Sequence, residues 1–146
     1  MDTKKFLTGT VVGGIAFFIL GYLIYGLLLE DFFIANIGSA SGVQRSMEEI
    51  VWWALILANF SLAGLLSYIF IKWAHVSTFK GGLRAGAAIG LLLNISIDLM
   101  MYSTSHMMNL TAAVVDIVVW TIAVAIAGGI IGAVLHAKPH DEHATA

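Results

Sequence analysis

The chain has 146 residues, of which 60% are hydrophobic and only 11% are charged. In a typical soluble domain, roughly a quarter of all residues are charged. This composition therefore excludes an ordinary soluble protein and indicates an integral membrane protein. The absence of cysteine excludes disulfides, thiolate nucleophiles and cysteine-ligated metal centres, and a net charge of −2 without a long basic run argues against a nucleic-acid partner.

Four apolar segments are each long enough to cross the hydrocarbon core of a membrane, which takes about 20 residues of helix. We therefore predict an all-α fold: an integral membrane bundle of four transmembrane helices, in a single domain over residues 1–137. Residues 138–146 are expected to form a polar C-terminal tail. The predicted spans are 6–29, 48–72, 82–103 and 109–136. Where the connections are short, sequence neighbours should pack antiparallel.

The first span follows two lysines, an arrangement that also occurs in secretory signals. Its uncharged run from Phe6 to Leu29 is much longer than the roughly 7 to 15 apolar residues of a signal core, so we interpret it as a membrane helix. A polar connection follows. Within it, the sequence SMEE (Ser46 to Glu49) fits a capping box that would start the second span at the membrane edge.

The basic residues are distributed unevenly between the two ends of the predicted bundle. Six of the seven Lys and Arg residues fall on the side of the termini, and only Arg45 falls on the other side. Loops rich in Lys and Arg tend to stay in the cytoplasm. We therefore expect both termini in the cytoplasm and a multi-pass protein of the bacterial inner membrane.

Small and polar residues recur every four positions along the third span. The five positions are Gly82, Gly86, Gly90, Asn94 and Asp98. Glycine stripes of this kind permit close helix contact in lipid, where hydrophobicity cannot drive association. The fourth span offers a matching surface that includes Gly128 and Gly132. We therefore expect the third and fourth helices to pack through these glycines, which would also favour a homo-oligomer or a membrane protein partner.

An acid pair is the most unusual feature of these two spans. Because the stripe faces other helices, Asn94 and Asp98 should point into the bundle. Asp98 and Asp116 lie similar distances from the outer ends of their helices, so a rise of about 1.5 Å per residue places both carboxyl groups at one depth. No Lys or Arg lies deep within any span. The expected states are therefore a protonated acid, a shared proton, or a carboxylate with a bound cation.

Hydrogen-bonding partners for this acid pair are expected from Asn94, from Asn59 in the second span and from Thr121 in the fourth. Intramembrane acids often belong to proton relays or ion paths, but protonated acids also link helices through hydrogen bonds. Both interpretations stay open. The leading hypothesis is a non-catalytic subunit or an oligomeric assembly component. The alternative is a small proton- or cation-coupled carrier that uses Asp98 and Asp116. No catalytic constellation is present, so an enzyme is not expected.

Four methionines surround His106 at the outer end of the third span. Thioether and imidazole ligands suit Cu(I), which makes Met101, His106 and Met107 weak copper candidates. The methionines come as adjacent pairs that point different ways around a helix, and methionine is a common gap filler in packed regions. We therefore predict no metal site and no cofactor.

Two segments resemble a known family. They are VVGGIAFFILGYLIYGLLLEDFF (Val11 to Phe33) and VDIVVWTIAVAIAGGIIGAVL (Val115 to Leu135). The first is similar to the first helix, and the second to the last helix, of small bacterial membrane proteins grouped as domain of unknown function seventeen sixty-one. The chain departs from that pattern at Ile24, where a tryptophan is usual, and at Leu27, where a proline is common.

This resemblance implies a four-helix membrane layout. The positions to which it carries over are Gly21, Tyr25, Asp116 and Gly132. The family has no established activity, so the resemblance implies no function.

Overall fold

The structure is a computed structural model that describes residues 2–43 and 45–136. The expected tail over 138–146 lies outside the described residues. Within the described residues the elements are helical and no strand forms. Their bounds are α1 (Thr3–Leu23), η1 (Ile24–Leu28), α2 (Glu30–Ala35), η2 (Met47–Glu49), α3 (Trp52–Ile69), η3 (Phe70–Ala74), α4 (Phe79–Thr104) and α5 (Leu110–His136).

Four helical segments are long and apolar enough to cross a membrane, which confirms the predicted all-α architecture and indicates a membrane protein. The segments are Thr3–Leu28, Trp52–Ala74, Phe79–Thr104 and Leu110–His136. The second begins later than predicted. The capping box forms, with the Glu49 carboxylate accepting from the Ser46 backbone N–H at 3.1 Å, but it starts the short turn η2, and α3 begins only at Trp52.

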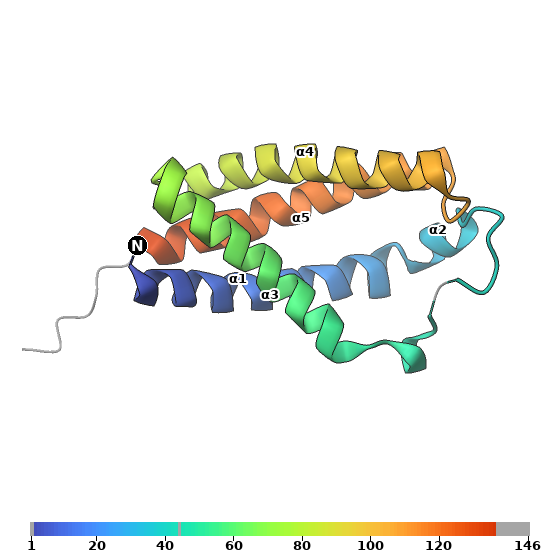
Figure 1. The fold of residues 1–146 in the computed structure, drawn as a ribbon, viewed down its shortest axis with the longest axis horizontal. Coiled ribbons are helices and arrows are strands. Elements are labelled where there is room, and N and C mark those ends of the chain that lie inside the picture. Colours follow the sequence, from blue (N-terminus) through green and yellow to red (C-terminus); the bar gives the residue numbers. More distant parts are fainter. Residues whose placement is uncertain (1, 44, 137–146) are drawn as a thin grey trace, which may run out of the picture.

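Both described ends of the chain lie at the same end of the bundle, which we call the termini end (Figure 1). The short connection from α3 to α4 also lies there. The opposite end, which we call the loop end, carries α2 and the connection from α4 to α5 (Figure 1).

The antiparallel pair of α4 and α5 is the most extensive helix contact in the described chain. It depends on glycine, because the two backbones touch. A Cβ atom added at Gly86 would lie 2.6 Å from the Val124 carbonyl oxygen, and one added at Gly128 would lie 2.6 Å from the Gly82 carbonyl oxygen. Added at Gly132, it would overlap the backbone that precedes α4. The glycines of the predicted stripe thus meet the predicted glycines of α5 inside one chain.

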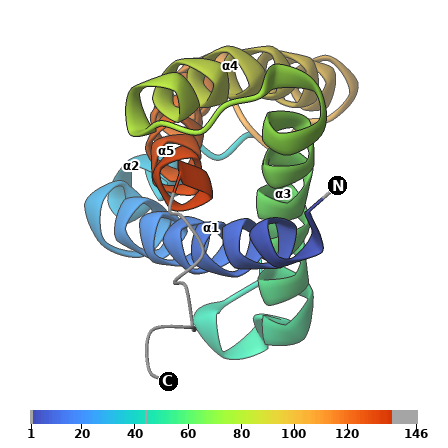
Figure 2. The same ribbon diagram turned by 90° about the vertical axis from the view of Figure 1, so that its left-hand side faces the viewer.

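The helix α3 packs mainly on α1, and it crosses α1 at an angle (Figures 1 and 2). Glycines of α1 permit this crossing, since a Cβ at Gly13 would clash with Ile131 and come within 3.0 Å of the Ala63 methyl group. Extensive packing of α3 on α4 is not observed, although their connection is short. The predicted antiparallel packing of neighbours therefore holds for α4 and α5 and is wrong for α3 and α4.

The hydrophobic core lies between α1, α3 and α5. Its largest fully buried side chains are Phe17, Leu66, Phe70, Val124 and Ile131. Many other large apolar side chains face outward, with Leu28 at 75% and Leu92 at 70% exposed. Such exposure is costly in water and favourable against lipid, which agrees with a bundle that crosses a membrane.

The segment after α2 is attached to the connection between α4 and α5. The Gly38 N–H donates to the Met107 carbonyl at 3.2 Å, and the Ala40 N–H donates to the His106 carbonyl at 3.1 Å. A Cβ at Gly38 would overlap the His106 carbonyl oxygen. The first part of the long connection is therefore a fixed cap over the loop end.

Candidate functional site

The two acids of the predicted pair lie opposite each other on α4 and α5. Gly90 packs against Val124, and the helices run antiparallel. Asp98, two turns beyond Gly90, therefore faces Asp116, two turns before Val124, and the two carboxyl groups lie close to each other. Asp98 is only 6% exposed. The matched depth expected from the sequence is found at this position, in the half of the bundle nearer the loop end.

A third oxygen group joins the pair from the first helix. The Tyr25 hydroxyl donates a hydrogen bond to Asp116. Tyr25 belongs to the wide turn η1, in which the Leu29 N–H reaches back to the Ile24 carbonyl at 2.8 Å. Turns of this width are frequent at functional sites. Here η1 continues α1 in a wider turn, and the side chain of Tyr25 reaches α5.

Reasoning from the residues did not assign Tyr25 to the acid pair. The family resemblance names both Tyr25 and Asp116, and the structure brings them into contact. A sequence signal was present, because Tyr25 lies several residues inside the first span, whereas tyrosine in membrane helices is enriched at the interface. A phenol at that depth needs a hydrogen-bond partner, and the opposing acids were the available candidates.

A line of polar groups continues from the acids along the contact between α4 and α5. Asn94 is 5% exposed, and the antiparallel register places it opposite Thr121 and its neighbours on α5. Asp98 Oδ2, Asn94 Nδ2 and Thr121 Oγ1 are buried and have no hydrogen-bond partner among the described residues. Buried polar atoms in native proteins are nearly always paired. Three unpaired atoms therefore lie along the contact between α4 and α5, which we call the seam.

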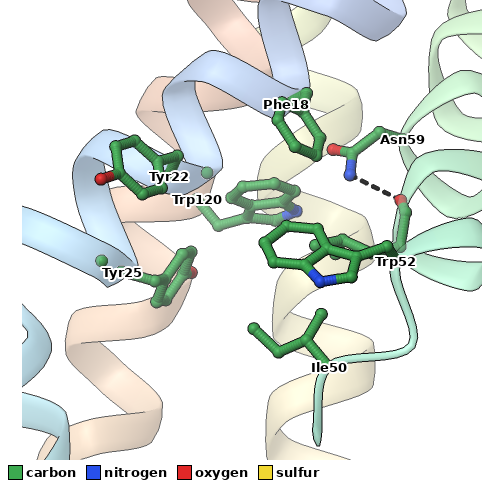
Figure 3. A pocket seen from close by; sticks show the side chains of 10 residues that line it. Phe18, Tyr22, Tyr25, Ile50, Trp52, Asn59 and Trp120 are labelled. Carbon is green, nitrogen blue, oxygen red and sulfur yellow. Dashed lines mark hydrogen bonds between the residues drawn. The ribbon is translucent and has the colours of Figure 1, made fainter. Parts of the chain in front are cut away.

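Asn59 does not join this cluster, in contrast to the prediction. Its amide Nδ2 donates to the Leu55 carbonyl of its own helix at 2.8 Å. Figure 3 shows the indole ring of Trp120 between Asn59 on one side and Tyr25 on the other. The physical reason is the tilt of α3, which crosses α1 and carries Asn59 away from the seam between α4 and α5 (Figure 2).

Asn59 instead lines a cavity of about 340 Å³ between α1, α3 and α5. The walls are mainly aromatic and aliphatic, and the side chains that define it include Phe18, Tyr25, Trp52, Leu55 and Trp120 (Figure 3). Gly21 also lines this cavity, and a Cβ added there meets no atom within 4 Å. The cavity therefore begins where α1 and α3 separate beyond their crossing.

The methionine cluster lies at the loop end. Met101, Met107 and Met108 line a smaller cavity of about 180 Å³ together with Phe33 and Asn36. His106 is exposed and is not among the lining residues. No group of three His, Asp or Glu side chains that suits a metal ion occurs within residues 2–43 and 45–136. The structure thus brings two of the three weak copper candidates together and leaves the imidazole outside.

The fold and the site together define a small four-helix membrane protein with a tyrosine-linked acid pair inside the bundle. Comparisons of the chain with family models, curated proteins and solved structures find no match. The resemblance to the family of unknown function stays a prediction. Function is therefore inferred from the geometry of the site alone.

Proposed function

We propose that this chain is a small, non-catalytic protein of the bacterial inner membrane that binds a proton or a small monovalent cation reversibly and carries it. The cluster of Tyr25, Asp98 and Asp116 is the binding site. One observation carries the proposal: oxygen groups from three helices meet inside the bundle, and no Lys, Arg or His among the described residues is buried. A negative charge at this position must be balanced by a proton or a cation.

The unpaired polar atoms favour ion binding over a purely structural link. If the acids only joined α4 to α5, protonation would let the pair satisfy its own hydrogen bonds, and the glycine contacts already hold these helices together. Instead, Asp98 Oδ2 and Asn94 Nδ2 remain available on the same helix face, four residues apart. Polar side chains inside a membrane bundle that lack protein partners commonly mark ion and proton paths.

The distribution of charge supports an orientation with both termini in the cytoplasm. Basic residues gather near the termini end of the bundle, at Lys4, Lys5, Lys72, Lys80 and Arg84, while Arg45 lies in the connection at the opposite end. The rule that basic loops remain in the cytoplasm then places the acid cluster in the outer half of the membrane.

Difference infrared spectroscopy of the protein in lipid nanodiscs tests the proposal, because protonated and ionised carboxyl groups absorb at different frequencies. We expect a protonated-carboxyl band that disappears when the pH is raised or when an excess of Na⁺ or K⁺ is added. The Asp98→Asn/Asp116→Asn double variant should lack the band, and Asp31→Asn, an exposed acid at the loop end, should retain it. A double variant whose spectra match those of the wild type at every pH and ion concentration contradicts the proposal.

Ion movement is the second part of this test. In sealed liposomes that contain the wild-type protein and a pH-sensitive dye, an imposed ion gradient should drive a change in internal pH. Replacement of both aspartates should abolish that change without altering the elution volume of the protein. A flux that is equal for the wild type and the double variant excludes the acid pair as the carrier site.

A role as an assembly component is the second candidate, and the position of α3 favours it. The helix α3 packs mainly on α1 and makes no extensive contact with α4. Much of the surface of α4 that faces α3 is therefore left uncovered. The glycine surfaces of α4 and α5, which we expected to attract partners, are occupied within the chain. A partner must therefore bind elsewhere. Native mass spectrometry after gentle extraction tests this candidate, since a stable mass larger than one chain is required.

A further inference from the structure

The cavity between α1, α3 and α5 has the composition of a site for an aromatic or cationic guest. The ring centroids of Phe18 and Trp52 lie 6.4 Å apart, and those of Tyr25 and Trp120 lie 5.9 Å apart, with the rings of each pair tilted against each other. These four rings come from three helices and surround one space (Figure 3). Faces of indole and phenol rings carry negative electrostatic potential and attract cations, most strongly when water is excluded.

The cavity is open to the surface of the bundle on one side. At its edge, Tyr22 is 51% exposed, Trp52 is 46% exposed and Leu55 is 41% exposed. All three residues belong to segments long and apolar enough to cross a membrane. The opening therefore lies between membrane-spanning segments, and it admits a guest with an apolar body.

The acid pair lies directly behind the inner wall of this cavity. The ring of Tyr25 forms part of the wall, and its hydroxyl group donates a hydrogen bond to Asp116. Trp120, one helical turn from Asp116, forms the next part of the wall. When the pair carries a negative charge, that charge acts on the cavity through a medium of low dielectric constant, where Coulomb attraction is strong.

We infer that this cavity binds a lipophilic organic cation, such as an aromatic quaternary ammonium ion, whose charge is balanced by Asp98 and Asp116. The inference rests on the proposed function and deepens it, because it names a class of cargo that exchanges with the proton or small cation of the acid pair. Charge complementarity selects this occupant: aromatic walls alone also accept a neutral molecule or a lipid chain, but neither balances the adjacent acids.

The orientation of the polar groups agrees with a quaternary cation. Asn59 Nδ2 is engaged by its own backbone, which leaves the carbonyl Oδ1 as the free polar atom of that side chain. Tyr25 directs its hydroxyl hydrogen toward Asp116, so its oxygen also presents electron pairs. Both groups therefore offer acceptors, which suit a positive guest that has no hydrogen to donate.

Calorimetric titration with benzyltrimethylammonium tests the inference, using the full-length protein in nanodiscs of zwitterionic phosphatidylcholine. The matched neutral probe is neopentylbenzene, in which carbon replaces the charged nitrogen and the shape is retained. We expect saturable binding of the cation that an excess of neopentylbenzene does not displace. Equal binding of the two probes would show that shape alone is recognised, and it would overturn the inference.

Gly21→Leu is the variant that locates the binding site. The new side chain points into the cavity and meets no atom at its Cβ, so it fills the cavity without disturbing the helices. Binding should weaken by about tenfold or more. Ala58→Leu introduces the same side chain at an exposed position of α3 and should leave binding unchanged. Cation binding that survives Gly21→Leu takes place elsewhere and overturns the inference.

The acid variants separate this inference from the proposed function. Asp98→Asn/Asp116→Asn should abolish binding of the organic cation, whereas Gly21→Leu should retain the infrared carboxyl response to pH. A wild-type protein that shows the carboxyl response but binds no benzyltrimethylammonium overturns the inference and leaves the proposed function intact. Cation binding that persists in the double variant, with no carboxyl response in the wild type, overturns both.

Discussion

The two helix pairs of this bundle use glycine for opposite purposes. Between α4 and α5, glycines on both helices bring the two backbones into contact and leave no room for a Cβ atom at these positions. Between α1 and α3, glycines permit a crossing near Gly13, and Gly21 then faces open space. In lipid, close packing must come from such small residues because hydrophobicity does not drive helices together. The comparison shows that one residue type builds both the rigid seam and the cavity.

The largest expected effect tests the rigid seam. Gly82→Ala places a methyl group on the backbone of Gly128, which cannot move aside as a side chain can. We expect a loss of about 3 kcal/mol in the free energy of unfolding, the upper part of the range typical of overpacking. Gly64→Ala is the matched control, since its Cβ would lie 3.7 Å from the nearest atoms, both of Thr10. Equal stability of the two variants in detergent unfolding would contradict the contact.

The second largest effect on stability is expected at the hydrogen bond from Tyr25 to Asp116, which links the α1/α3 pair to the α4/α5 pair. Tyr25→Phe removes the hydroxyl that donates to Asp116 and leaves a buried acceptor unpaired. A loss of about 1 to 2 kcal/mol is expected. Tyr22→Phe, at an exposed position, should change stability little. A double-mutant cycle with Asp116→Ala, which removes the acceptor, measures the coupling, and a coupling energy of zero would show that the contact contributes nothing.

A smaller effect is expected at the cap of α5. The Asn109 side chain accepts from the Ala112 N–H at 2.8 Å and donates to Asn36 Oδ1 at 3.0 Å. Asn109→Ala should cost about 1 kcal/mol, the usual contribution of a helix cap. Hydrogen exchange should then accelerate at Ala112 and over residues 36–40. Asn109→Asp retains the acceptor and loses the donor, so it should spare Ala112 and affect only residues 36–40.

The smallest effect on stability is expected at Gly21, which faces the cavity between α1 and α3. Gly21→Ala adds a methyl group where no atom lies within 4 Å of it. Alanine also favours the helix over glycine, so we expect a change between zero and a gain of about 1 kcal/mol. A clear loss of stability, measured beside Gly82→Ala under the same conditions, would show that α1 and α3 close on each other at this position.

The sequence predicted the features that depend on one helix or on one hairpin. Apolar length located the four spans, and the four-residue period placed the glycine stripe and Asp98 on one face. The rise per residue then matched the depths of Asp98 and Asp116, because their helices are joined by a short connection.

Contacts between segments that are far apart in the sequence could not be predicted from the sequence. The tilt of α3 is set by which glycines of α1 meet Ala63 and Ser67, and it moved Asn59 away from the acids. The pairing of residues 36–40 with 106–108 consists largely of backbone hydrogen bonds, which leave no mark in the residue types. The contact of Tyr25 with Asp116 joins residues 91 positions apart and depends on the wide turn η1.

The short connection between α4 and α5 also has a consequence for assembly of the protein in the membrane. Contacts between neighbouring segments form faster than contacts between distant ones. We therefore expect α4 and α5 to associate as an inserted hairpin, with Asp98 and Asp116 already face to face. Tyr25 and Asn36, supplied by the N-terminal third of the chain, then complete the cluster and its cap. We therefore expect the acid pair to form when only α4 and α5 have associated. The contact from the first helical segment to this pair forms last.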